Sequence, residues 1–470
     1  MFGRIKKIHF IGLGGIGISG MAELLHILGF KISGSDLRRS EITDKLEQAG
    51  IRFCEGHHPE NIDDCDMVVY SSAVRPDNPE IEAAHSRSIP VIRRAEMLGE
   101  LLKVAETSIA VAGTHGKTTT SSMIGAMLTT ARRDPTMVIG GIVRSLATNA
   151  RRGQGDIIVV EADEFDRSFL SLRPTVAVIT NIDLEHLDCY ENLDELSQAF
   201  TSFANAVPFY GRVVVCLDEP SIQALLPRLQ RPVTTYGLAP QADVRARKAV
   251  YHETSVEFEL VVPGEEPVQA QLQVPGEHNV KNALAAVAVG LELEVPLAEA
   301  LPGLAQFSGV NRRFEITETI GDVIFVDDYA HHPREVAAVL QAARQGWDRR
   351  LVAVFQPHLY TRTRDFHEDF ARSFLASDVL VVTGIYPARE DPIEGITGEL
   401  IANDAVCSGH KQVTYAPDKK DLPVTVAGLI KAGDMVITMG AGDITRYNQK
   451  IRKAYAEVTA RGVVTGAPER

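Results

Sequence analysis

The sequence is poor in the features that mark secreted, membrane-spanning or nucleic-acid-binding chains. Its five cysteines are scattered over 470 residues and form no CxxC pair. We therefore expect no disulfide framework and no zinc site, and a reducing cytoplasm as the location. No run of about eighteen apolar residues occurs, so no membrane insertion is expected. The apolar stretch near the N-terminus is interrupted by glycines, unlike a signal peptide.

A surplus of basic residues is also missing. Lysine and arginine number 48 against 62 acidic residues, which gives a net charge of −14. Nucleic-acid binding usually requires a basic face, so this balance predicts no nucleic-acid partner. Neither low-complexity tracts nor short repeats interrupt the chain, and its 45% hydrophobic content is ordinary for a globular protein.

The length and the order of the predicted elements indicate several α/β domains. A chain of 470 residues corresponds to roughly two to four domains. Short apolar runs alternate with helical patterns, which predicts parallel sheets. We expect three domains, at residues 1–105, 106–312 and 313–470. The alternating stretch "EFELVVPGEEPVQAQLQVPG" predicts a β-hairpin at the edge of the central sheet.

A first glycine-rich loop, "GLGGIG", fits the GxGxxG pattern at residues 12–17. It follows a predicted strand and opens a predicted helix, where glycines allow close approach of a pyrophosphate to the helix N-terminus. Asp36 ends the second strand, at the distance expected for a ribose contact. A nicotinamide or flavin cofactor, a nucleotide-sugar pyrophosphate, or tight packing without a ligand would each satisfy this pattern.

A second loop, "GTHGKTTT", begins at Gly113. It departs from the GxxxxGK[ST] pattern because Val111 replaces the first glycine. It retains the strand, the glycine turn and a lysine that opens a helix. Lys117 is expected to hold the β- and γ-phosphates of a nucleotide, and the Thr118 hydroxyl to contact magnesium. The alternative is a capped helix after a glycine turn.

Polar residues follow further strands of the middle and last domains. Glu161 follows "DIIVV" and His186 follows "VAVIT", where open α/β sheets place ligands. Glu161 is a candidate magnesium ligand, whereas histidine is an unusual ligand for that ion. "DDYAHHP" and "FQPHLYTRTRD" follow strands of the last domain, and "NRRFE" marks its boundary. Arginines there suit phosphate or carboxylate, and surface ion pairs are the alternative.

Taken together, these motifs resemble the Mur ligases, the ATP-dependent amide-forming enzymes of peptidoglycan precursor synthesis. The resemblance rests on "GLGGIGISGMA", "YSSAVRPDNPE", "AGTHGKTTTSSM", "EADEFDRSFL", "TNIDLEHLD", "GEHNVKNALAA", "VNRRFE", "DDYAHHPREV" and "FQPHLYTRTRDF". It implies a Rossmann-like first domain for the UDP substrate, a P-loop ATPase-like central domain and a Rossmann-like third domain for the amino acid. "GGIGISG" favours the members that join L-alanine to UDP-N-acetylmuramate.

The resemblance also implies roles for individual residues. ATP and two magnesium ions are the implied cofactors, with Thr118, Glu161 and His186 as metal ligands. Lys117, Glu161, His186 and Arg313 are the implied catalytic residues. The implied ATP site comprises Gly113, Thr114, His115, Gly116, Lys117, Thr118, Thr119, Asn279, Asn282, Arg313, Asp328 and His332. The implied UDP-substrate site comprises Gly12, Gly14, Gly15, Ile16, Gly17, Ser19, Asp36, Ser71, Ser72 and Ala73. Tyr329, His331 and Arg362 would line the amino-acid site, where Leu359 replaces an arginine found in some members.

Other functions compete with this one. A murein tripeptide ligase or another amide ligase of the family would share most of the motifs. A nicotinamide-dependent oxidoreductase would use the first loop and leave "GTHGKTTT" unexplained. A non-catalytic nucleotide-binding regulator would leave the acid and histidine clusters unexplained. The sequence leaves the oligomeric state open between a monomer and a weak dimer.

Overall fold

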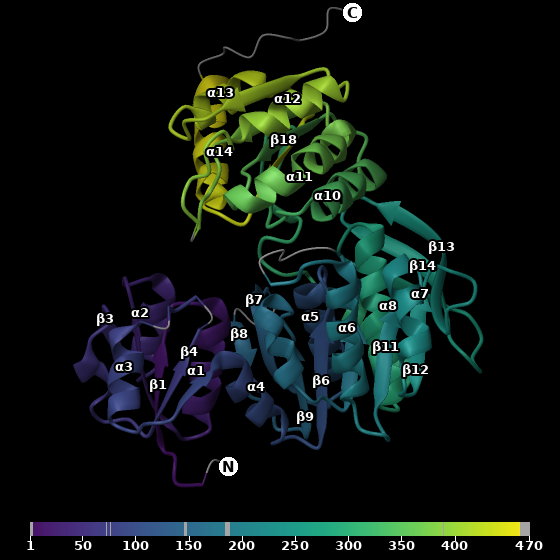
Figure 1. The fold of residues 1–470 in the computed structure, drawn as a ribbon. Coiled ribbons are helices and arrows are strands. Elements are labelled where there is room, and N and C mark those ends of the chain that lie inside the picture. Colours follow the sequence, from purple (N-terminus) through teal and green to yellow (C-terminus); the bar gives the residue numbers. More distant parts are fainter. Residues whose placement is uncertain are drawn as a thin grey trace, which may run out of the picture. The chain divides into compact units, whose positions relative to one another are not determined.

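The computed structural model of the chain describes residues 3–71, 73–75, 77–144, 148–183, 189–388 and 390–460, without the side chains of Ile16, Thr148 and Asp166. These residues form two compact units (Figure 1). Unit 1 comprises Met1–Ala249, Phe258–Gln271 and Val280–Ser308, and unit 2 comprises Val250–Glu257, Leu272–Asn279 and Gly309–Arg470. Three sheets with helices between their strands confirm the predicted α/β class.

The first sheet has five parallel strands in the order β3-β2-β1-β4-β5. The strands are β1 (Lys7–Ile11), β2 (Lys31–Asp36), β3 (Arg52–Glu55), β4 (Met67–Tyr70) and β5 (Val91–Arg93). The helices are α1 (Ile16–Ile27), α2 (Glu41–Gln48), η1 (Pro59–Ile62), α3 (Pro79–Ser86) and α4 (Arg94–Leu102). The sequence pattern did not predict β3 and β5, which are short and half exposed and therefore lack an apolar run.

The second sheet has ten strands in the order β15-β14-β13-β12-β11-β10-β6-β9-β7-β8. The strands are β6 (Thr107–Ala112), β7 (Thr136–Val143), β8 (Thr148–Arg151), β9 (Ile157–Glu161), β10 (Val176–Ile179), β11 (Arg212–Cys216), β12 (Val233–Gly237), β13 (Val244–His252), β14 (Ser255–Val261) and β15 (Val268–Leu272). The helices are α5 (Lys117–Thr130), η2 (Phe165–Ser171), α6 (Leu193–Asn205), α7 (Pro220–Leu225), η3 (Leu226–Arg228), α8 (Glu277–Glu292) and α9 (Leu297–Ala305). The predicted hairpin is β14–β15, and β15 is an edge strand as expected.

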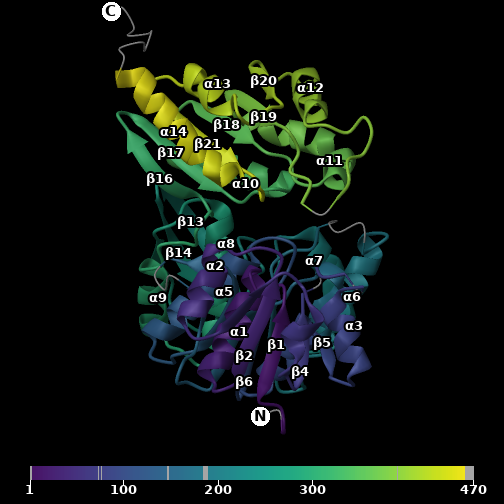
Figure 2. The ribbon, with the colours of Figure 1, turned by 90° about the vertical axis from the view of Figure 1, so that its left-hand side faces the viewer.

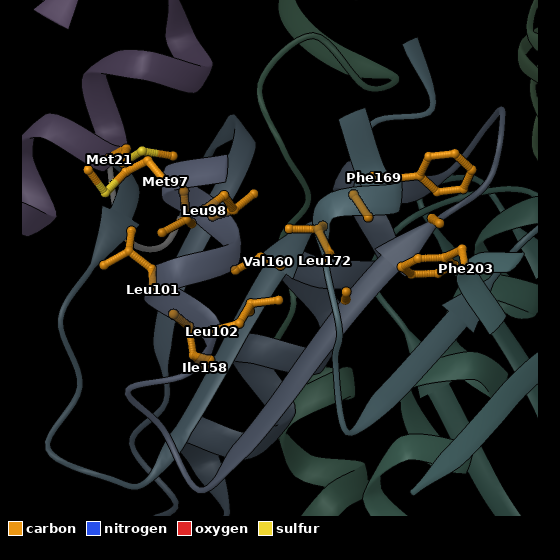
Figure 3. Packing of buried hydrophobic residues seen from close by; sticks show 14 of the residues in the cluster. Met21, Met97, Leu98, Leu101, Leu102, Ile158, Val160, Phe169, Leu172 and Phe203 are labelled. Carbon is orange, nitrogen blue, oxygen red and sulfur yellow. The ribbon is translucent and has the colours of Figure 1, made fainter. Parts of the chain in front are cut away.

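The first two sheets share one apolar core inside unit 1. Helix α4 contributes Met97, Leu98 and Leu101 to a cluster that also contains Val160 of β9 and Phe169 of η2 (Figure 3). All five side chains are at most 5% exposed. Burial of such side chains contributes about 1.5–3 kcal/mol each. The elements that carry the two glycine loops are therefore held by continuous packing.

The third sheet, in unit 2, has six strands in the order β16-β17-β21-β18-β19-β20. The strands are β16 (Glu315–Ile320), β17 (Val323–Asp328), β18 (Leu351–Phe355), β19 (Val379–Thr383), β20 (Val413–Ala416) and β21 (Met435–Met439). The helices are α10 (Pro333–Gly346), α11 (Tyr360–Ser373), η4 (Phe374–Ala376), α12 (Glu399–Cys407), α13 (Leu422–Leu429) and α14 (Ile444–Ala460). Strand β16 is antiparallel to β17, and the other pairings are parallel.

Helices cover both faces of this third sheet. Alternate strand residues pack against α10, α11 and α12 on one face and against α13 and α14 on the other (Figure 2). This burial explains the near-continuous apolar runs in the sequence of its strands. Within the described ranges, no helix combines the length and the apolar character that a bilayer crossing requires.

Candidate functional site

The first glycine loop connects β1 to α1 at the carboxyl edge of the first sheet. Gly12 and Leu13 donate main-chain N–H bonds to Ser35 O at 2.9 Å. Gly12 has φ +85°, a left-handed value that favours glycine. A Cβ atom on Gly14 would lie 2.9 Å from Asp36 Oδ2. Glycine at position 14 thus leaves room for the Asp36 carboxylate to pack against the backbone of the loop.

Asp36 is engaged by the loop itself. Its Oδ2 accepts the Gly14 N–H at 2.8 Å, and its Oδ1 accepts the Leu37 N–H at 2.7 Å. Asp36 lies at the sheet edge where a ribose contact was predicted, but both of its carboxylate oxygens already accept main-chain N–H groups. Asp36 therefore fixes the shape of the loop, whatever else it contacts.

The remaining residues predicted for the UDP substrate lie around this loop. Ser19 is buried in α1, and its N–H is bonded to Gly15 O. Ser71 Oγ accepts the Ala73 N–H at 3.3 Å just after β4. Ser72 and the Ile16 side chain lie outside the described residues. Sequence reasoning missed Arg94, whose guanidinium would collide with a Cβ on Gly17. It opens a helix far along the chain, and no spacing rule connects it with the loop.

The second loop is shorter than the usual P-loop pattern requires. Val111 is a fully buried residue of β6, paired with Val178 of β10 and Glu161 of β9. The turn begins only at Gly113, with φ +128°, and ends at Gly116, with φ +82°, before α5. A glycine at position 111 is unnecessary because that position lies in the strand.

Residues after β10 hold this loop in place. Asn181 Oδ1 accepts the His115 N–H at 2.8 Å, and Asn181 Nδ2 donates to His115 O at 3.0 Å. Thr114 Oγ1 accepts the Asp183 N–H at 2.9 Å. A Cβ on Gly113 would collide with Thr180 Oγ1. The loop shape therefore depends on the "TNID" segment, which is 65 residues or more along the chain.

Lys117 lies at the N-terminus of α5 with its ammonium group in a ring of oxygens. Nζ donates to Gly113 O at 2.7 Å and forms an ion pair with Glu164 Oε2 at 2.7 Å. Burial lowers the pKa of Lys117, but the carboxylates of Glu164, Asp163 and Glu161 outweigh this effect and raise it. The lysine is therefore fully protonated, which suits contact with phosphate. Sequence reasoning missed Glu164 because the "EADEFD" run offers four acids without distinguishing them.

Glu161 and Thr118 meet at the start of α5. Thr118 Oγ1 donates to both carboxylate oxygens of Glu161 at 3.0 Å, and Gly140 N donates to Glu161 Oε2 at 2.7 Å. A carboxylate next to a hydroxyl after a phosphate loop is the oxygen donor set that magnesium prefers. The predicted ligand His186 lies outside the described residues. Among the residues described, no group of three or more His, Cys, Asp or Glu side chains could hold a metal ion.

The two asparagines of α8 have different surroundings. Asn282 Oδ1 accepts the Thr120 hydroxyl at 3.1 Å, and a Cβ on Gly116 would lie 2.9 Å from it. Asn282 thus packs behind the phosphate loop. Asn279, three residues earlier, belongs to unit 2 and donates from Nδ2 to Pro275 O at 2.7 Å.

Unit 2 brings together the residues predicted for the amino-acid site. The rings of Tyr329 and His331 lie 5.3 Å apart, and those of His331 and His358 lie 5.9 Å apart. Arg362 Nη1 lies 3.2 Å from His358 Nδ1, and Arg362 is only 8% exposed. His358 thus contacts both His331 and Arg362. In the sequence it is only one of several polar residues after β18. Leu359 is the N-cap residue of α11 and has φ +70°.

The boundary segment "NRRFE" is fixed by a buried carboxylate. Asp328 accepts the Phe314 N–H at 2.6 Å and the Ala330 N–H at 2.7 Å, one on each oxygen. Burial raises the pKa of Asp328 to about 6, and the nearby Arg313 opposes this rise. The Arg313 guanidinium lies 5.4 Å from the Tyr329 ring centroid. Asp328 thus positions Arg313 and the start of the Tyr329 loop.

His332 caps the helix that follows. Its Nδ1 accepts the Arg334 N–H at 3.4 Å at the N-terminus of α10, and its side chain is 5% exposed. The Nδ1 atom of His332, for which a nucleotide contact was predicted, is therefore already hydrogen-bonded within the chain. The pair Asp328 and His332 frames the loop between β17 and α10.

Two glycine loops of the nucleotide-binding type, each at the carboxyl end of a strand with parallel neighbours, define a multidomain α/β nucleotide-binding protein. The family models described as "Mur ligase family, catalytic domain", "Mur ligase middle domain" and "Mur ligase, glutamate ligase domain" match residues 7–105, 111–290 and 312–442. The chain belongs to the Mur ligase family.

Curated relatives and solved structures agree with this assignment. The UDP-N-acetylmuramate–L-alanine ligase of Geotalea uraniireducens (strain Rf4) is 50% identical over 96% of this chain and 98% of its own length. The ligase of the same name from Salinibacter ruber (strain DSM 13855 / M31) is 50% identical over 95% of this chain and 94% of its own. The crystal structure of UDP-N-acetylmuramate–alanine ligase MurC from Thermotoga maritima superposes with a TM-score of 0.81. It has 30% identity and covers 96% of this chain and 99% of that one.

Proposed function

We propose that this chain joins L-alanine to the lactyl carboxylate of UDP-N-acetylmuramate, with ATP converted to ADP and phosphate. The observation that carries the proposal is the position of the Lys117 ammonium group. It lies at a helix N-terminus, within the Gly113 loop and beside the Thr118–Glu161 pair. Relatives named for this reaction are about half identical over nearly the whole chain. Murein tripeptide ligation is the runner-up and no described residue favours it.

The two glycine loops serve two nucleotides. The UDP end of the substrate binds in the domain at residues 1–105. Its site is formed by the loop at Gly12–Gly17 together with Ser19, Asp36 and residues 71–73. The loop at Gly113–Thr119 binds the ATP phosphates within residues 106–312. Asn282 packs behind the second loop and supports its shape, while Asn279 contacts the adenine. The domain at residues 313–470 binds the amino acid.

A carboxylate is a poor electrophile, so the reaction requires its activation. Its attack on the γ-phosphorus of ATP forms an acyl phosphate, and Lys117 offsets the charge on the transferring group. Thr118, Glu161 and His186 would hold magnesium, which supplies further charge compensation when bound. Arg313, on the boundary segment that Asp328 fixes, and His332 are further residues that we propose for binding of ATP.

The alanine amine then attacks the acyl phosphate and expels phosphate. An amine with a pKa near 8 in solution must first lose a proton. In the neutral ring of His331, Nδ1 carries the hydrogen because its partner, Tyr329 O at 2.9 Å, can only accept. Nε2 is then the basic atom and one candidate to receive that proton, beside water and a substrate phosphate oxygen.

The alanine carboxylate requires a cationic partner. Arg362 supplies a guanidinium fork that matches a carboxylate in two contacts. Tyr329 and His331 wall the side-chain space, so glycine and L-serine are used at reduced efficiency and D-alanine fails. A wall rejects smaller residues weakly, since one methyl group is worth about 1–3 kcal/mol.

The test is phosphate release from ATP with UDP-N-acetylmuramate, measured as kcat/KM against a panel of amino acids. The highest value is expected for L-alanine, with no release when UDP-N-acetylmuramate is omitted. A preference for a tripeptide, glutamate or a diamino acid would overturn the assignment and promote the runner-up. Reduction of NADP without ATP turnover would promote the oxidoreductase alternative.

A further inference from the structure

A buried polar network joins strands β1 and β2 of the first sheet to α3 and η1, and the proposed reaction does not use it. Glu80, His9 and Ser35 are all 0% exposed. Ser35 Oγ donates to Glu80 Oε2 at 2.6 Å, and His9 Nε2 lies 3.4 Å from the same oxygen. Glu80 Oε1 accepts from Asn61 Nδ2 at 2.5 Å and from the His58 N–H at 3.2 Å.

The Glu80 carboxylate is ionised in this network. Burial opposes its ionisation, but the nearby His9 ring and the hydrogen bonds from Ser35 and Asn61 outweigh burial and lower the pKa of Glu80. An ionised carboxylate can only accept hydrogen bonds. The Ser35 hydroxyl therefore donates its single hydrogen to Glu80 Oε2.

His57 connects this network with the carboxyl edge of the sheet. It follows β3 by two residues, and the Gly56 N–H is bonded to Asp36 O at 2.8 Å. His57 Nδ1 lies 3.0 Å from Ser35 Oγ, and 14% of the side chain is exposed. His57 thus stands at the edge that carries the first glycine loop, where open α/β sheets bind ligands.

The hydrogen-bond order fixes the tautomer of His57. Because Ser35 Oγ has already given its hydrogen to Glu80, it can only accept from His57 Nδ1. In the neutral ring Nδ1 then carries the hydrogen and Nε2 carries the lone pair. No described residue of the chain is bonded to His57 Nε2, so this lone pair is available at the partly exposed side of the ring.

We propose that His57 is a specificity-determining residue for the UDP substrate, whose Nε2 accepts a hydrogen bond from the uridine moiety. This inference rests on the proposed function of the first domain. Uridine offers two kinds of donor, the uracil N3–H and the ribose hydroxyls. Asp36 is the other acceptor expected for ribose, and both its oxygens already hold main-chain N–H groups. Glu80 and Ser35 are positioning residues, which act by setting the His57 tautomer.

The substitution Glu80→Gln tests the relay with little change of shape. Because Oε1 accepts two donors, Asn61 Nδ2 and the His58 N–H, the glutamine carbonyl must take that position. The amide NH₂ then faces Ser35 and becomes a donor to it. Ser35 must turn its hydrogen toward His57 Nδ1, which forces His57 into the Nε2–H tautomer. Nε2 changes from an acceptor to a donor.

The experiment compares UDP binding and histidine ¹⁵N spectra in the full chain. The wild-type His57 signal, assigned by its absence in His57→Ala, should show the Nδ1–H tautomer, and Glu80→Gln should show Nε2–H. Both variants should bind UDP about tenfold more weakly by calorimetry, the effect of one lost or inverted hydrogen bond. His85→Ala, an exposed position on the same helix as Glu80, is the matched control and should bind UDP normally.

Substrate analogues identify the donor. One of 3-methyl-UDP, 2′-deoxy-UDP and 3′-deoxy-UDP should bind wild type about tenfold more weakly than UDP and lose this penalty in His57→Ala. If all three analogues keep their penalties in His57→Ala, or if Glu80→Gln flips the tautomer without weakening UDP binding, the role of His57 is overturned. Gly14→Val separates this failure from a wrong domain assignment. Loss of UDP binding there would leave the first domain as the UDP site, whereas normal binding would remove it.

Discussion

Replacing Lys117 by methionine should separate the stability of the phosphate loop from its chemistry. Lys117 and Glu164 form an ion pair at 2.7 Å with side chains 13% and 1% exposed. Breaking such a pair by removing one partner costs about 3–5 kcal/mol, because a buried charge is left uncompensated. We expect the lower end, about 3 kcal/mol, since Lys117 is partly exposed. The melting temperature should fall by roughly 6–12 °C.

The double variant Lys117→Met/Glu164→Gln should recover most of this stability, because it removes the uncompensated charge. It should still release no phosphate from ATP, while UDP binding persists in both variants. Lys103→Met is a matched control, since its pair with Glu100 is exposed and should contribute less than about 1 kcal/mol. Calorimetric unfolding and phosphate release measure the two effects. A Lys117→Met protein as stable as wild type would refute the buried pair, and turnover in the double variant would refute the role of Lys117 in ATP chemistry.

Four further predictions concern other parts of the sites. Gly113→Ala should abolish ATP binding through its collision with Thr180, whereas Gly264→Ala, with positive φ but open space, should cost only about 1–2 kcal/mol; equal effects in melting and ATP titration would contradict this. The pKa of Asp328 is raised from 3.8 to about 6, so its contribution to the free energy of unfolding is present below about pH 4 and lost as the pH rises through about 6. The loss should approach roughly 3 kcal/mol in urea unfolding and be absent in Asp328→Asn. A variant whose free energy of unfolding still falls with pH as in the wild type would contradict this. Glu161→Gln should raise the manganese concentration for half-maximal turnover at least about tenfold without altering UDP affinity, and an unchanged requirement would exclude it as a ligand. Arg362→Ala should raise the KM for L-alanine by about tenfold or more; an unchanged KM would place the carboxylate contact elsewhere.

The sequence alone predicted the elements and motifs that depend on local pattern. Apolar runs of fixed period indicated the buried strands β6, β9 and β10, and glycines before Lys117 indicated a phosphate loop. Such features are visible because hydrophobic periodicity and backbone conformation are set by neighbouring residues. The same reasoning placed Glu161 and Asp328 at strand ends. It missed β3 and β5, whose short, half-exposed strands carry little apolar signal.

The tertiary structure decided which strand ends meet. Only the strand order β10-β6-β9 brings Asn181 to the Gly113 loop and Glu164 to Lys117, across 66 and 47 residues of sequence. The same applies to Glu80 and His57, which share Ser35 because β2, β3 and the helix after β4 converge at one sheet. A sequence shows that a polar residue follows a strand, but strand neighbours are chosen by packing of the whole sheet. Partners, and with them ionisation and tautomer, are therefore properties of the fold.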